Sequence, residues 1–473
     1  MSIYKWSDGM FVGRENELES LNKLYEDDKF QFIVVYGRRR VGKTTLLLEF
    51  CKGKPCIFYV ADESVDSVSL EKFSKEVFSY FHLSGLSSFQ SWEEAFYFLG
   101  ERSKEKRLIV VIDEFQYLVN SNKSIPSILQ KLIDHHLKDT KLFLIICGSY
   151  VSFMEKEILG YKSPLYGRRT AQFEIVPFDF FDSRKFFPGY SLEEQVTVYG
   201  ILGGTPQYLV SFDENLDIFE NIKQKILNKS SYLYEEPKFL LREELREPML
   251  YNSILEAIAV GKTKLNEIAT KIRVNDAKVS KYIDTLVNLK IIERIKPKPI
   301  GKTGRGSIFK IKDNFFKFWY RFVFENRELI EQGLLNEVLE RKIKPFINEY
   351  LGPVFEDIAF EYLKRMNKKG KLPFVFEKIG KWWGNNPIKK QEEEIDIVAY
   401  DKENILFGEC KWKNGLINMS VIRKLIDKSV LFDFKNKFYV YFAKNGFTEE
   451  VMNFAKHNEN ILIVSLKDFV DFS

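Results

Sequence analysis

Eight residues beginning at Gly37 have the types and spacing of a loop that binds phosphate groups. The segment Gly37-Arg-Arg-Arg-Val-Gly-Lys43-Thr44 follows the pattern G-x-x-x-x-G-K-[S/T]. An apolar run at 32–36 precedes it and predicts a buried strand, and 46–50 predicts a helix. In that setting backbone N–H groups face the β- and γ-phosphates, Lys43 adds a positive charge, and the Thr44 hydroxyl can ligate Mg²⁺. The alternative is a chance glycine-rich turn. The residues expected to contact the nucleotide are Gly37, Arg38, Arg39, Arg40, Val41, Gly42, Lys43, Thr44 and Thr45.

Two adjacent carboxylates, Asp113 and Glu114, follow the apolar run at 108–112. Such a run is typical of a parallel strand that is covered on both faces. Phosphoanhydride hydrolysis needs positioning and charge stabilisation, so we expect Asp113 to hold Mg²⁺ through water and Glu114 to orient and deprotonate the attacking water. The alternative is an acidic helix start after a core strand, since Asp and Glu favour helix N-termini. The phosphate loop upstream favours the hydrolytic interpretation.

Alternating strands and helices from residue 10 to about 180 must position these groups. This pattern predicts a parallel αβα sandwich, which binds its ligand at the carboxyl ends of the strands. From Phe178 to about Ser230 the pattern is helical, and residues 231–248 are rich in Glu and Arg, which we interpret as a connector. The candidate strands of the sandwich are 32–37, 56–61, 107–112, 141–147 and 172–176.

Four further segments resemble signatures of the archaeal-type ATPases, a prokaryotic P-loop family close to the AAA+ and signal-transducing switch ATPases. Phe11–Leu18 is similar to the V-G-R-E-x-E-L box, and Lys141–Ser149 is similar to the sensor strand. The segments 163–170 and 203–209 resemble two later motifs of the family. The resemblance covers nearly the whole chain, and it implies ATP as the nucleotide and a helical lid over it.

The same resemblance implies two further groups at the nucleotide. Ser149 would sense the γ-phosphate, at a position where most AAA+ proteins carry Asn. Arg168 or Arg169 would act as an arginine finger, either within its own chain or on a neighbour in a homo-oligomer. The alternative for the two arginines is a solvated basic loop.

Residues 251–312 have the pattern of a winged helix-turn-helix, with helices expected at 253–260, 264–271 and 276–287. Two short strands, 291–295 and 307–311, would flank a wing. Between Lys262 and Lys317 there are fifteen basic and five acidic residues, whereas the whole chain has a net charge of only +5. We expect nucleic acid, preferably DNA, as the partner; the alternatives are a protein-interaction or spacer module and a solvated basic face. The residues suited to phosphate contacts are Lys278, Lys281, Lys296, Lys298, Lys302 and Arg305.

A second group of carboxylates, together with a lysine, lies in the last 120 residues. Two strands are expected to form a hairpin across the turn 401–404, one with Asp396 and the other with Glu409 and Lys411. The period of two puts Glu409 and Lys411 on one strand face, and Asp396 can converge on that face. Two carboxylates and an ammonium can bind Mg²⁺ and activate water for phosphodiester attack. Glu356, on the helix expected at 354–363, is placed to be a further metal ligand.

This D…E-x-K pattern resembles the PD-(D/E)XK nuclease family. Trp382-Trp-Gly384, together with 394–396, is similar to the nuclease-like domain that is often fused behind archaeal-type ATPases. Ile395-Asp396 stands where that family has a Pro-Asp pair. The resemblance implies Mg²⁺-dependent cleavage of nucleic acid. Two alternatives stay open: a structural hairpin with an ordinary ion pair, and a nuclease fold that is kept without cleavage.

The composition, with 45% apolar and 29% charged residues, is that of a globular protein with a large core. No apolar run approaches the roughly 20 residues that span a bilayer. The N-terminus is too polar for a signal peptide, so we expect a cytoplasmic protein that does not bind membranes. The four cysteines are too scattered for a disulfide framework or a zinc cluster: Cys51, Cys56, Cys147 and Cys410.

The sequence thus predicts an α/β protein with four parts. They are a P-loop ATPase core at 1–177, a helical lid and connector at 178–248, a winged helix-turn-helix at 249–313, and an α/β restriction-endonuclease-like domain at 314–473. The expected function is ATP binding and hydrolysis, coupled to nucleic-acid binding and to Mg²⁺-dependent cleavage. The alternative is a regulatory, DNA-tethered NTPase switch whose last domain binds partners or DNA without cleaving.

Overall fold

The computed structural model describes residues 11–472, apart from positions 86, 246, 299–305 and 388. The chain separates into two compact units. The first consists of Met1–Pro177 together with Thr205–Gln207, and the second consists of Phe178–Gly204 together with Tyr208–Ser473. Among the described residues, none of the helices is long and apolar enough to cross a membrane.

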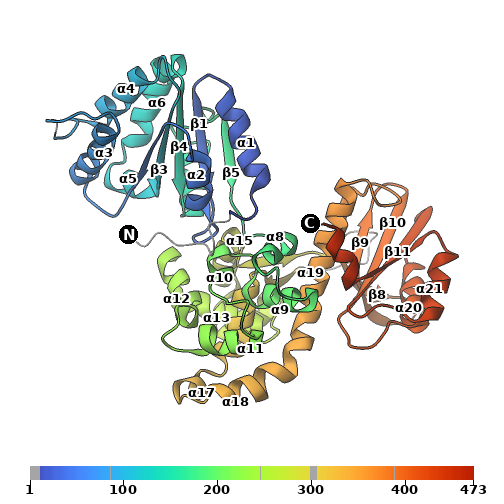
Figure 1. Cartoon of the computed structure of the whole chain (residues 1–473). Helices are drawn as coiled ribbons and strands as arrows, with labels where there is room; N and C mark the ends of the chain where they lie inside the picture. The colour runs from blue at the N-terminus through green and yellow to red at the C-terminus, as the bar shows by residue number, and fades with distance from the viewer. Residues whose placement is uncertain (1–10, 86, 246, 299–305, 388, 473) are drawn as a thin grey trace. The chain divides into compact units, whose positions relative to one another are not determined.

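A five-stranded parallel sheet forms the centre of the first unit (Figure 1). Its strand order is β2-β3-β4-β1-β5, so the phosphate-loop strand β1 lies between β4 and β5. The continuous apolar runs predicted buried strands, and β1, β3 and β4 are buried along their whole length. The strands are β1 (Gln31–Tyr36), β2 (Cys56–Val60), β3 (Leu108–Asp113), β4 (Leu142–Gly148) and β5 (Ala171–Glu174), which confirms the predicted parallel sheet.

Helices cover both faces of this sheet because alternate strand side chains point to opposite sides. Ile33 and Val35 of β1 pack in a cluster with Leu46 of α2, whereas Phe32 and Val34 face a second cluster on the other side. The first face carries α1 (Glu15–Glu26) and α2 (Lys43–Cys51). The other face carries α3 (Asp66–Tyr80), α4 (Trp92–Arg102), α5 (Phe115–Ser121), α6 (Ile125–His135), α7 (Val151–Phe153) and η3 (Met154–Ile158). The short turn η2 (Leu137–Asp139) follows α6.

The second unit begins with short helices, and one of them lies where the sequence indicated a connector. Residues 232–244 form the helix α12 (Tyr232–Glu244), although Pro237 lies inside it. Leu233, Leu240 and Leu241 pack into the core at helical spacing, and the many Glu and Arg residues between them concealed this pattern. The other elements of this stretch are α8 (Phe180–Ser183), η4 (Arg184–Phe186), α9 (Leu192–Leu202), α10 (Pro206–Leu209), α11 (Ile218–Asn221) and η5 (Ile222–Leu227). The first two residues of α10 belong to the first unit.

Three helices and a small hairpin follow, at the positions where the sequence predicted them. The helices are α13 (Pro248–Ala259), α14 (Leu265–Ile272) and α15 (Asp276–Asn288), and the antiparallel strands are β6 (Ile292–Ile295) and β7 (Ile308–Ile311). Lys302 and Arg305 of the expected wing lie outside the described residues. A further helical stretch leads to the long helix α19 (Ile347–Lys368) through α16 (Asn314–Phe318), η6 (Trp319–Phe324), α17 (Arg327–Glu331), α18 (Leu335–Val338), η7 (Leu339–Ile343) and η8 (Lys344–Phe346).

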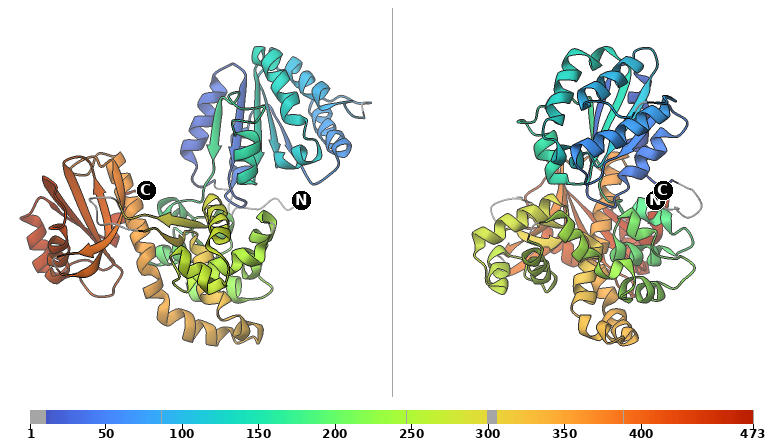
Figure 2. Two further views of the ribbon diagram at one scale, coloured as in Figure 1. Left: turned by 180° about the vertical axis from the view of Figure 1, so that it is seen from behind. Right: turned by 90° about the vertical axis from the view of Figure 1, so that its left-hand side faces the viewer.

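The chain ends in a mixed five-stranded sheet of order β12-β11-β10-β9-β8. Strand β9 runs antiparallel to its neighbours β8 and β10, whereas β10, β11 and β12 run parallel. Helix α19 packs on one face through Phe355 and Ile358, while Ile422 and Leu425 of α20 pack on the other (Figures 1 and 2). The elements are β8 (Lys378–Asn386), β9 (Gln391–Tyr400), β10 (Asn404–Lys411), α20 (Met419–Ser429), β11 (Asn436–Ala443), α21 (Glu449–Lys456), β12 (Ile461–Ser465) and η9 (Leu466–Phe472).

Candidate functional site

The phosphate loop joins β1 to α2, and its conformation depends on glycine. A Cβ atom at Gly37, where φ is +153°, would lie 2.1 Å from the carbonyl oxygen of Ile175. Gly42 precedes α2 in the left-handed region, at φ 88°. Lys43 is the first residue of α2, and its Nζ donates to the carbonyl oxygens of Gly37 (2.8 Å) and Arg38 (3.1 Å). The Lys43 ammonium therefore lies over the loop, where phosphate groups would be bound.

Thr44 and Asp113 meet at the carboxyl ends of β1 and β3. Thr44 Oγ1 donates to Asp113 Oδ2 across 2.6 Å, and Asp113 is only 1% exposed. The other carboxylate oxygen of Asp113 accepts from the backbone N–H of Glu114 at 2.9 Å. A hydroxyl and a carboxylate are the hard oxygen donors that Mg²⁺ takes, so this pair fits the ion.

Glu114 lies beside this pair and is held by two side chains. It directly precedes α5 and has a left-handed backbone, at φ 53°, which is uncommon for a residue other than glycine. Its Oε2 accepts from Ser149 Oγ across 2.6 Å and from Gln116 Nε2. The same Gln116 nitrogen lies 3.2 Å from Ser149 Oγ. Ser149 follows β4 directly, so neighbouring strands bring Glu114 and Ser149 together.

Gln116 is completely buried and was not predicted as a site residue. One signal in the sequence could have identified Gln116. It is a polar residue in an otherwise apolar stretch, two positions after the carboxylate that is predicted to activate water. Because Gln116 contacts both Glu114 and Ser149, it fixes the position of one against the other.

Arg14 and Thr205 also contact the loop region and were not predicted as contacts. Arg14, of the segment 11–18, donates from Nη2 to the carbonyl oxygens of Val41 (3.2 Å) and Val176. Arg38 Nη2 donates to Thr205 Oγ1 at 3.1 Å. Arg14 and Thr205 are thus connected to the loop by hydrogen bonds.

Arg39 of the phosphate loop contacts two tyrosines that follow β3 and β4. Arg39 Nη2 donates to the hydroxyl of Tyr117 at 3.1 Å, and its guanidinium carbon lies 5.3 Å from the ring centroid of Tyr150. Tyr150 follows Ser149 directly. The loop is therefore in contact with the residues that follow β3 and β4.

Arg168 and Arg169 lie elsewhere in the first unit. They come just before β5, whose first residue Ala171 pairs with Ile33 near the start of β1. In a parallel sheet the amino ends of the strands lie together, so the backbone of the two arginines lies at the end of the sheet opposite the phosphate loop. Arg168 donates to both carboxylate oxygens of Asp134, at 2.9 and 2.6 Å.

The second predicted group lies on β9 and β10 of the second unit. The antiparallel ladder pairs Gly408 with Ile397, next to Glu409 and Asp396. Asp396 Oδ2 accepts from the backbone N–H of Cys410 at 2.9 Å, and Lys411 forms an ion pair with Glu409. The structure therefore brings Asp396, Glu409 and Lys411 to one place in the sheet.

Glu356 on α19 contributes to the electrostatics of this place. Burial, followed by the negative charges of Glu409 and Glu356, raises the pKa of Asp396 to about 7. Glu356 itself pairs with Lys381 of β8. The carboxylates of Glu356 and Glu409 each contact a lysine. Among the described residues, no group of three or more His, Cys, Asp or Glu is arranged to hold a metal ion. Carboxylate oxygens are nevertheless ligands that Mg²⁺ takes. A bound cation would stabilise the ionised form of a buried carboxyl group that lies beside two negative charges.

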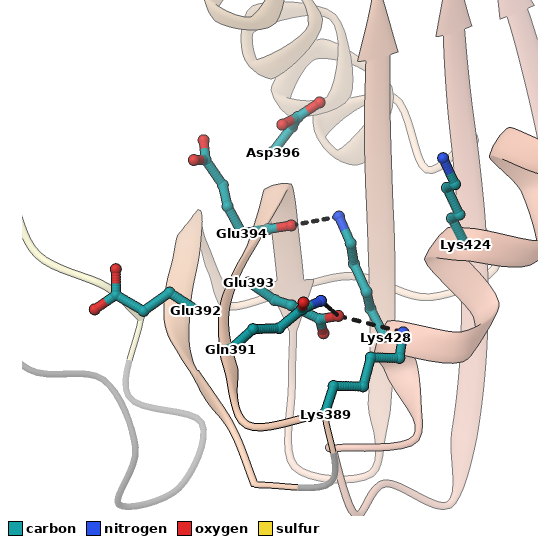
Figure 3. Close-up of a pocket in the computed structure, with 8 residues that line it drawn as sticks. All are labelled: Lys389, Gln391, Glu392, Glu393, Glu394, Asp396, Lys424 and Lys428. Carbon is teal, nitrogen blue, oxygen red and sulfur yellow. Dashed lines mark hydrogen bonds and ion pairs between the residues drawn. The ribbon is translucent and has the colours of Figure 1, made fainter.

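A cavity of about 530 Å³ opens beside Asp396 (Figure 3). Its walls are acidic on β9 and basic on α20. Lys428 Nζ donates to the carbonyl oxygen of Glu394 at 2.7 Å, and Lys389 Nζ lies 3.3 Å from Glu393 Oε1. The lining residues are Lys389, Gln391, Glu392, Glu393, Glu394, Asp396, Lys424 and Lys428.

The predicted basic residues divide into exposed and packed ones. Lys278 and Lys281 on α15 and Lys296 after β6 are exposed. Lys298 instead packs at the start of the last sheet, because its backbone N–H donates to the carbonyl oxygen of Lys381 at 3.0 Å. Its side chain also lies where a Cβ atom on Gly380 would be.

Comparison with known proteins agrees with the fold of the first unit. Residues 11–212 match a family described as an ATPase domain predominantly from Archaea, and residues 319–428 match one described as archaeal and bacterial proteins of unknown function. An uncharacterized ATP-binding protein of Pyrococcus horikoshii is 26% identical over 317 residues, which cover 59% of this chain and 90% of that protein. A Walker-type ATPase of Pyrococcus abyssi, of known structure, is 24% identical with a TM-score of 0.50, over 66% of this chain and 96% of that one.

An uncharacterized protein of Methanocaldococcus jannaschii is similar along its whole length. It is 36% identical over 464 residues, which cover 97% of this chain and 100% of that protein. Together with the ATPase-domain match, this similarity confirms the predicted ATPase relationship. The chain belongs to the same family as the M. jannaschii protein, and its residues 11–212 match the ATPase domain found predominantly in Archaea.

Proposed function

We propose that the first unit hydrolyses ATP with Glu114 as the general base. The observation that carries this proposal is the pair of hydrogen bonds from Ser149 and Gln116 to one oxygen of Glu114, beside the Thr44–Asp113 pair. A carboxylate fixed in this way can accept a proton from water at a defined atom.

Each of the other groups has a separate task in this proposal. Lys43 and the loop N–H groups bind the phosphates, and Thr44 and Asp113 hold Mg²⁺. The bound ion supplies positive charge where negative charge develops during phosphoryl transfer. Glu114 takes the proton of the attacking water, while Ser149 and Gln116 keep its carboxylate oriented.

Two substitutions separate binding from hydrolysis. We expect Lys43→Ala to abolish or strongly weaken ATP binding, because the loop loses the charge that meets the phosphates. Glu114→Gln should keep ATP binding and lower kcat by at least about 100-fold, since only the proton acceptor is lost. Lys75→Ala, an exposed change on α3, is the matched control. Micromolar ATP affinity in Lys43→Ala, or wild-type turnover in Glu114→Gln, would exclude these roles.

We further propose that α13–α15 with β6 and β7 form a winged helix that binds DNA. Support comes from the exposed Lys278 and Lys281 on α15, within a segment that has ten more basic than acidic residues. Replacing both by Glu should weaken binding to DNA of any sequence and reduce its salt dependence, because fewer counterions are released. Lys342→Glu, also exposed, should bind like the wild type. Unchanged affinity and salt slope in the double variant would favour a protein-binding or solvated face.

The last sheet is proposed to cleave nucleic acid with Mg²⁺. Support comes from the convergence of Asp396, Glu409 and Lys411 and from the raised pKa of Asp396 beside Glu409 and Glu356. Asp396 and Glu409 would hold the ion, and Lys411 would orient water or stabilise developing charge. Glu356 would be an additional ligand. The second candidate function is regulatory: the Lys381–Glu356 and Lys411–Glu409 ion pairs favour a domain that binds without cleaving.

Nicking of plasmid DNA in the presence of ATP and Mg²⁺ or Mn²⁺ distinguishes the two. If the sheet cleaves, alanine at Asp396, Glu409 or Lys411 should each remove nicking and leave ATP hydrolysis intact, because the three serve one unit. Glu356→Ala should have a milder effect. Glu392→Ala, at the exposed rim of the cavity, is the control. Absence of cleavage by the wild type on both DNA and RNA would favour the regulatory function.

A further inference from the structure

Two partly buried cysteines meet at the far end of the helix that begins at the phosphate loop. Cys51 is the last residue of α2 and Cys56 is the first residue of β2. Cys56 Sγ donates to Cys51 Sγ across 2.8 Å. That separation is short for two sulfur atoms that are not bonded, and it exceeds the roughly 2.05 Å of a disulfide by less than one ångström. The other two cysteines, Cys147 and Cys410, are buried elsewhere.

The turn between the two thiols holds them in this position. The backbone N–H of Lys54 donates to the carbonyl oxygen of Cys51 at 3.0 Å, and Gly53 supplies the left-handed backbone of the turn at φ +70°. Cys56 pairs with Ile109 of β3 in the parallel sheet. Both cysteines are therefore anchored by regular structure, and a small side-chain movement would bring the sulfurs to bonding distance.

We propose that Cys51 and Cys56 are a modification site at which an intramolecular disulfide joins the carboxyl end of α2 to the start of β2. The co-reactant is a small external disulfide, such as glutathione disulfide. Cys51, as the thiolate, attacks one sulfur of that disulfide, which gives a mixed disulfide and releases one thiol. Cys56 then loses its proton, attacks Cys51 Sγ and releases the second thiol. Two protein thiols become one disulfide while the external disulfide becomes two thiols, so electrons and atoms balance.

The order of the two attacks follows from the contact between the thiols. The hydrogen bond to Cys51, followed by burial, raises the pKa of the Cys56 thiol, so Cys56 retains its proton while Cys51 is the acceptor. Both residues are partly exposed, which gives the external disulfide access. Lys43 and Thr44 lie at the opposite end of the same helix, so the cross-link would leave the phosphate-binding residues free of modification.

Thiol counting and peptide mapping on the full chain test this proposal. The protein is incubated with glutathione disulfide, quenched with acid, denatured and alkylated. We expect two of its four cysteines to be alkylated, and all four after reduction. Trypsin cleaves after Lys52 but not between Lys54 and Pro55, so residues 44–52 and 53–72 form separate peptides. These two peptides should be recovered joined to each other before reduction and apart after it.

Two variants and a melting curve complete the test. Cys147→Ser should keep the joined peptides, and Cys51→Ser should lose them. The oxidised wild type should melt about 4–9 °C above the reduced protein, because the cross-link constrains the unfolded chain. Four alkylated cysteines after incubation, or glutathione adducts at Cys51 or Cys56 without joined peptides, would overturn the proposal. The wild-type comparison with and without reductant decides this even if Cys51→Ser does not fold.

Discussion

At the scale of single residues, Glu114 depends on side chains that come from different parts of the chain. Its left-handed backbone places the carboxylate at the carboxyl end of β3. A side-chain hydroxyl that follows β4 and an amide in the first turn of α5 both donate to the same oxygen. We therefore propose that Gln116 and Ser149 are positioning residues, which act through Glu114.

We predict that Gln116→Ala and Ser149→Ala each lower the kcat for ATP hydrolysis by about 10-fold, since a less restrained carboxylate spends less time in the reactive orientation. The KM for ATP should change little, because neither side chain belongs to the phosphate loop. Ser149→Thr keeps the hydroxyl and should recover most of the kcat. Steady-state kinetics of the three variants check this. An increase in KM with kcat unchanged would assign the two residues to nucleotide binding instead.

The residues that could be predicted at this scale belong to short contiguous motifs. Lys43, Thr44, Asp113 and Glu114 are recognisable because each follows a buried strand at fixed spacing. The hydrogen bonds of Arg14 with Val176 and of Arg38 with Thr205 could not be predicted, since they join positions more than 160 residues apart and depend on tertiary packing. Gln116 gave a weak local signal, but its partner Ser149 is on another strand.

At the scale of elements, the strands were predictable and α12 was not. A buried parallel strand needs apolar side chains at nearly every position, and this leaves a continuous signal in the sequence. In α12 only one side of the helix is buried. That side includes Glu236, whose buried carboxylate accepts from the Tyr208 hydroxyl at 2.8 Å. The composition of that stretch therefore indicated a connector although its spacing was helical. The order of the strands in each sheet leaves no such local pattern.

Helix α19 carries a buried carboxyl whose titration should change the stability of the second unit. Burial, followed by the charge of Asp179, raises the pKa of Glu361 to about 8, from an ordinary value of 4.5. Its oxygens accept from the Phe180 N–H at 2.9 Å and the Tyr199 hydroxyl at 3.2 Å. A raised folded-state pKa means that the folded chain holds the proton more tightly. The stabilisation that protonated Glu361 gives to the folded state is therefore complete below about pH 4.5 and is lost as the pH rises towards about 8.

We predict that Glu361→Gln removes much of this pH dependence. The amide resembles the protonated carboxyl, so it can accept from Phe180 and donate to Tyr199 without titrating. One pKa unit corresponds to about 1.4 kcal/mol. The wild-type free energy of unfolding should therefore differ between pH 5 and pH 8.5 by several times the experimental error. Urea unfolding of both proteins at the two pH values measures it. Equal losses of stability in wild type and variant would show that Glu361 does not titrate in this range.

At the scale of the whole molecule, Arg169 is a residue through which one copy of the chain could act on another. Its backbone comes just before β5, at the end of the sheet where the parallel strands begin. Arg168 is held by Asp134, which leaves Arg169, 6.0 Å from the ring of Tyr166, as the better candidate for a finger. We propose that it acts on the nucleotide of a neighbouring copy.

We predict that Arg169→Ala lowers ATP hydrolysis and that mixing it with Lys43→Ala restores part of the activity. In mixed assemblies one copy would supply an intact phosphate loop and the other an intact arginine, so activity should exceed the sum of the two separate samples. Arg168→Lys, mixed in the same way, serves as the comparison. Purely additive rates over a range of protein concentrations would rule out a finger acting between copies.

The first unit is completed by three residues that the chain supplies late. Its core ends at Pro177, yet Thr205–Gln207 belong to it, and Thr205 accepts from Arg38 of the phosphate loop. During synthesis, domains form from the N-terminus as the chain emerges. Here the nucleotide unit cannot acquire its last contact until the first 27 residues of the second unit, 178–204, have also been made. The residues of the two units are therefore synthesised in an interleaved order. In a nascent chain that stops near Pro177, Arg38 of the phosphate loop would still lack its contact with Thr205.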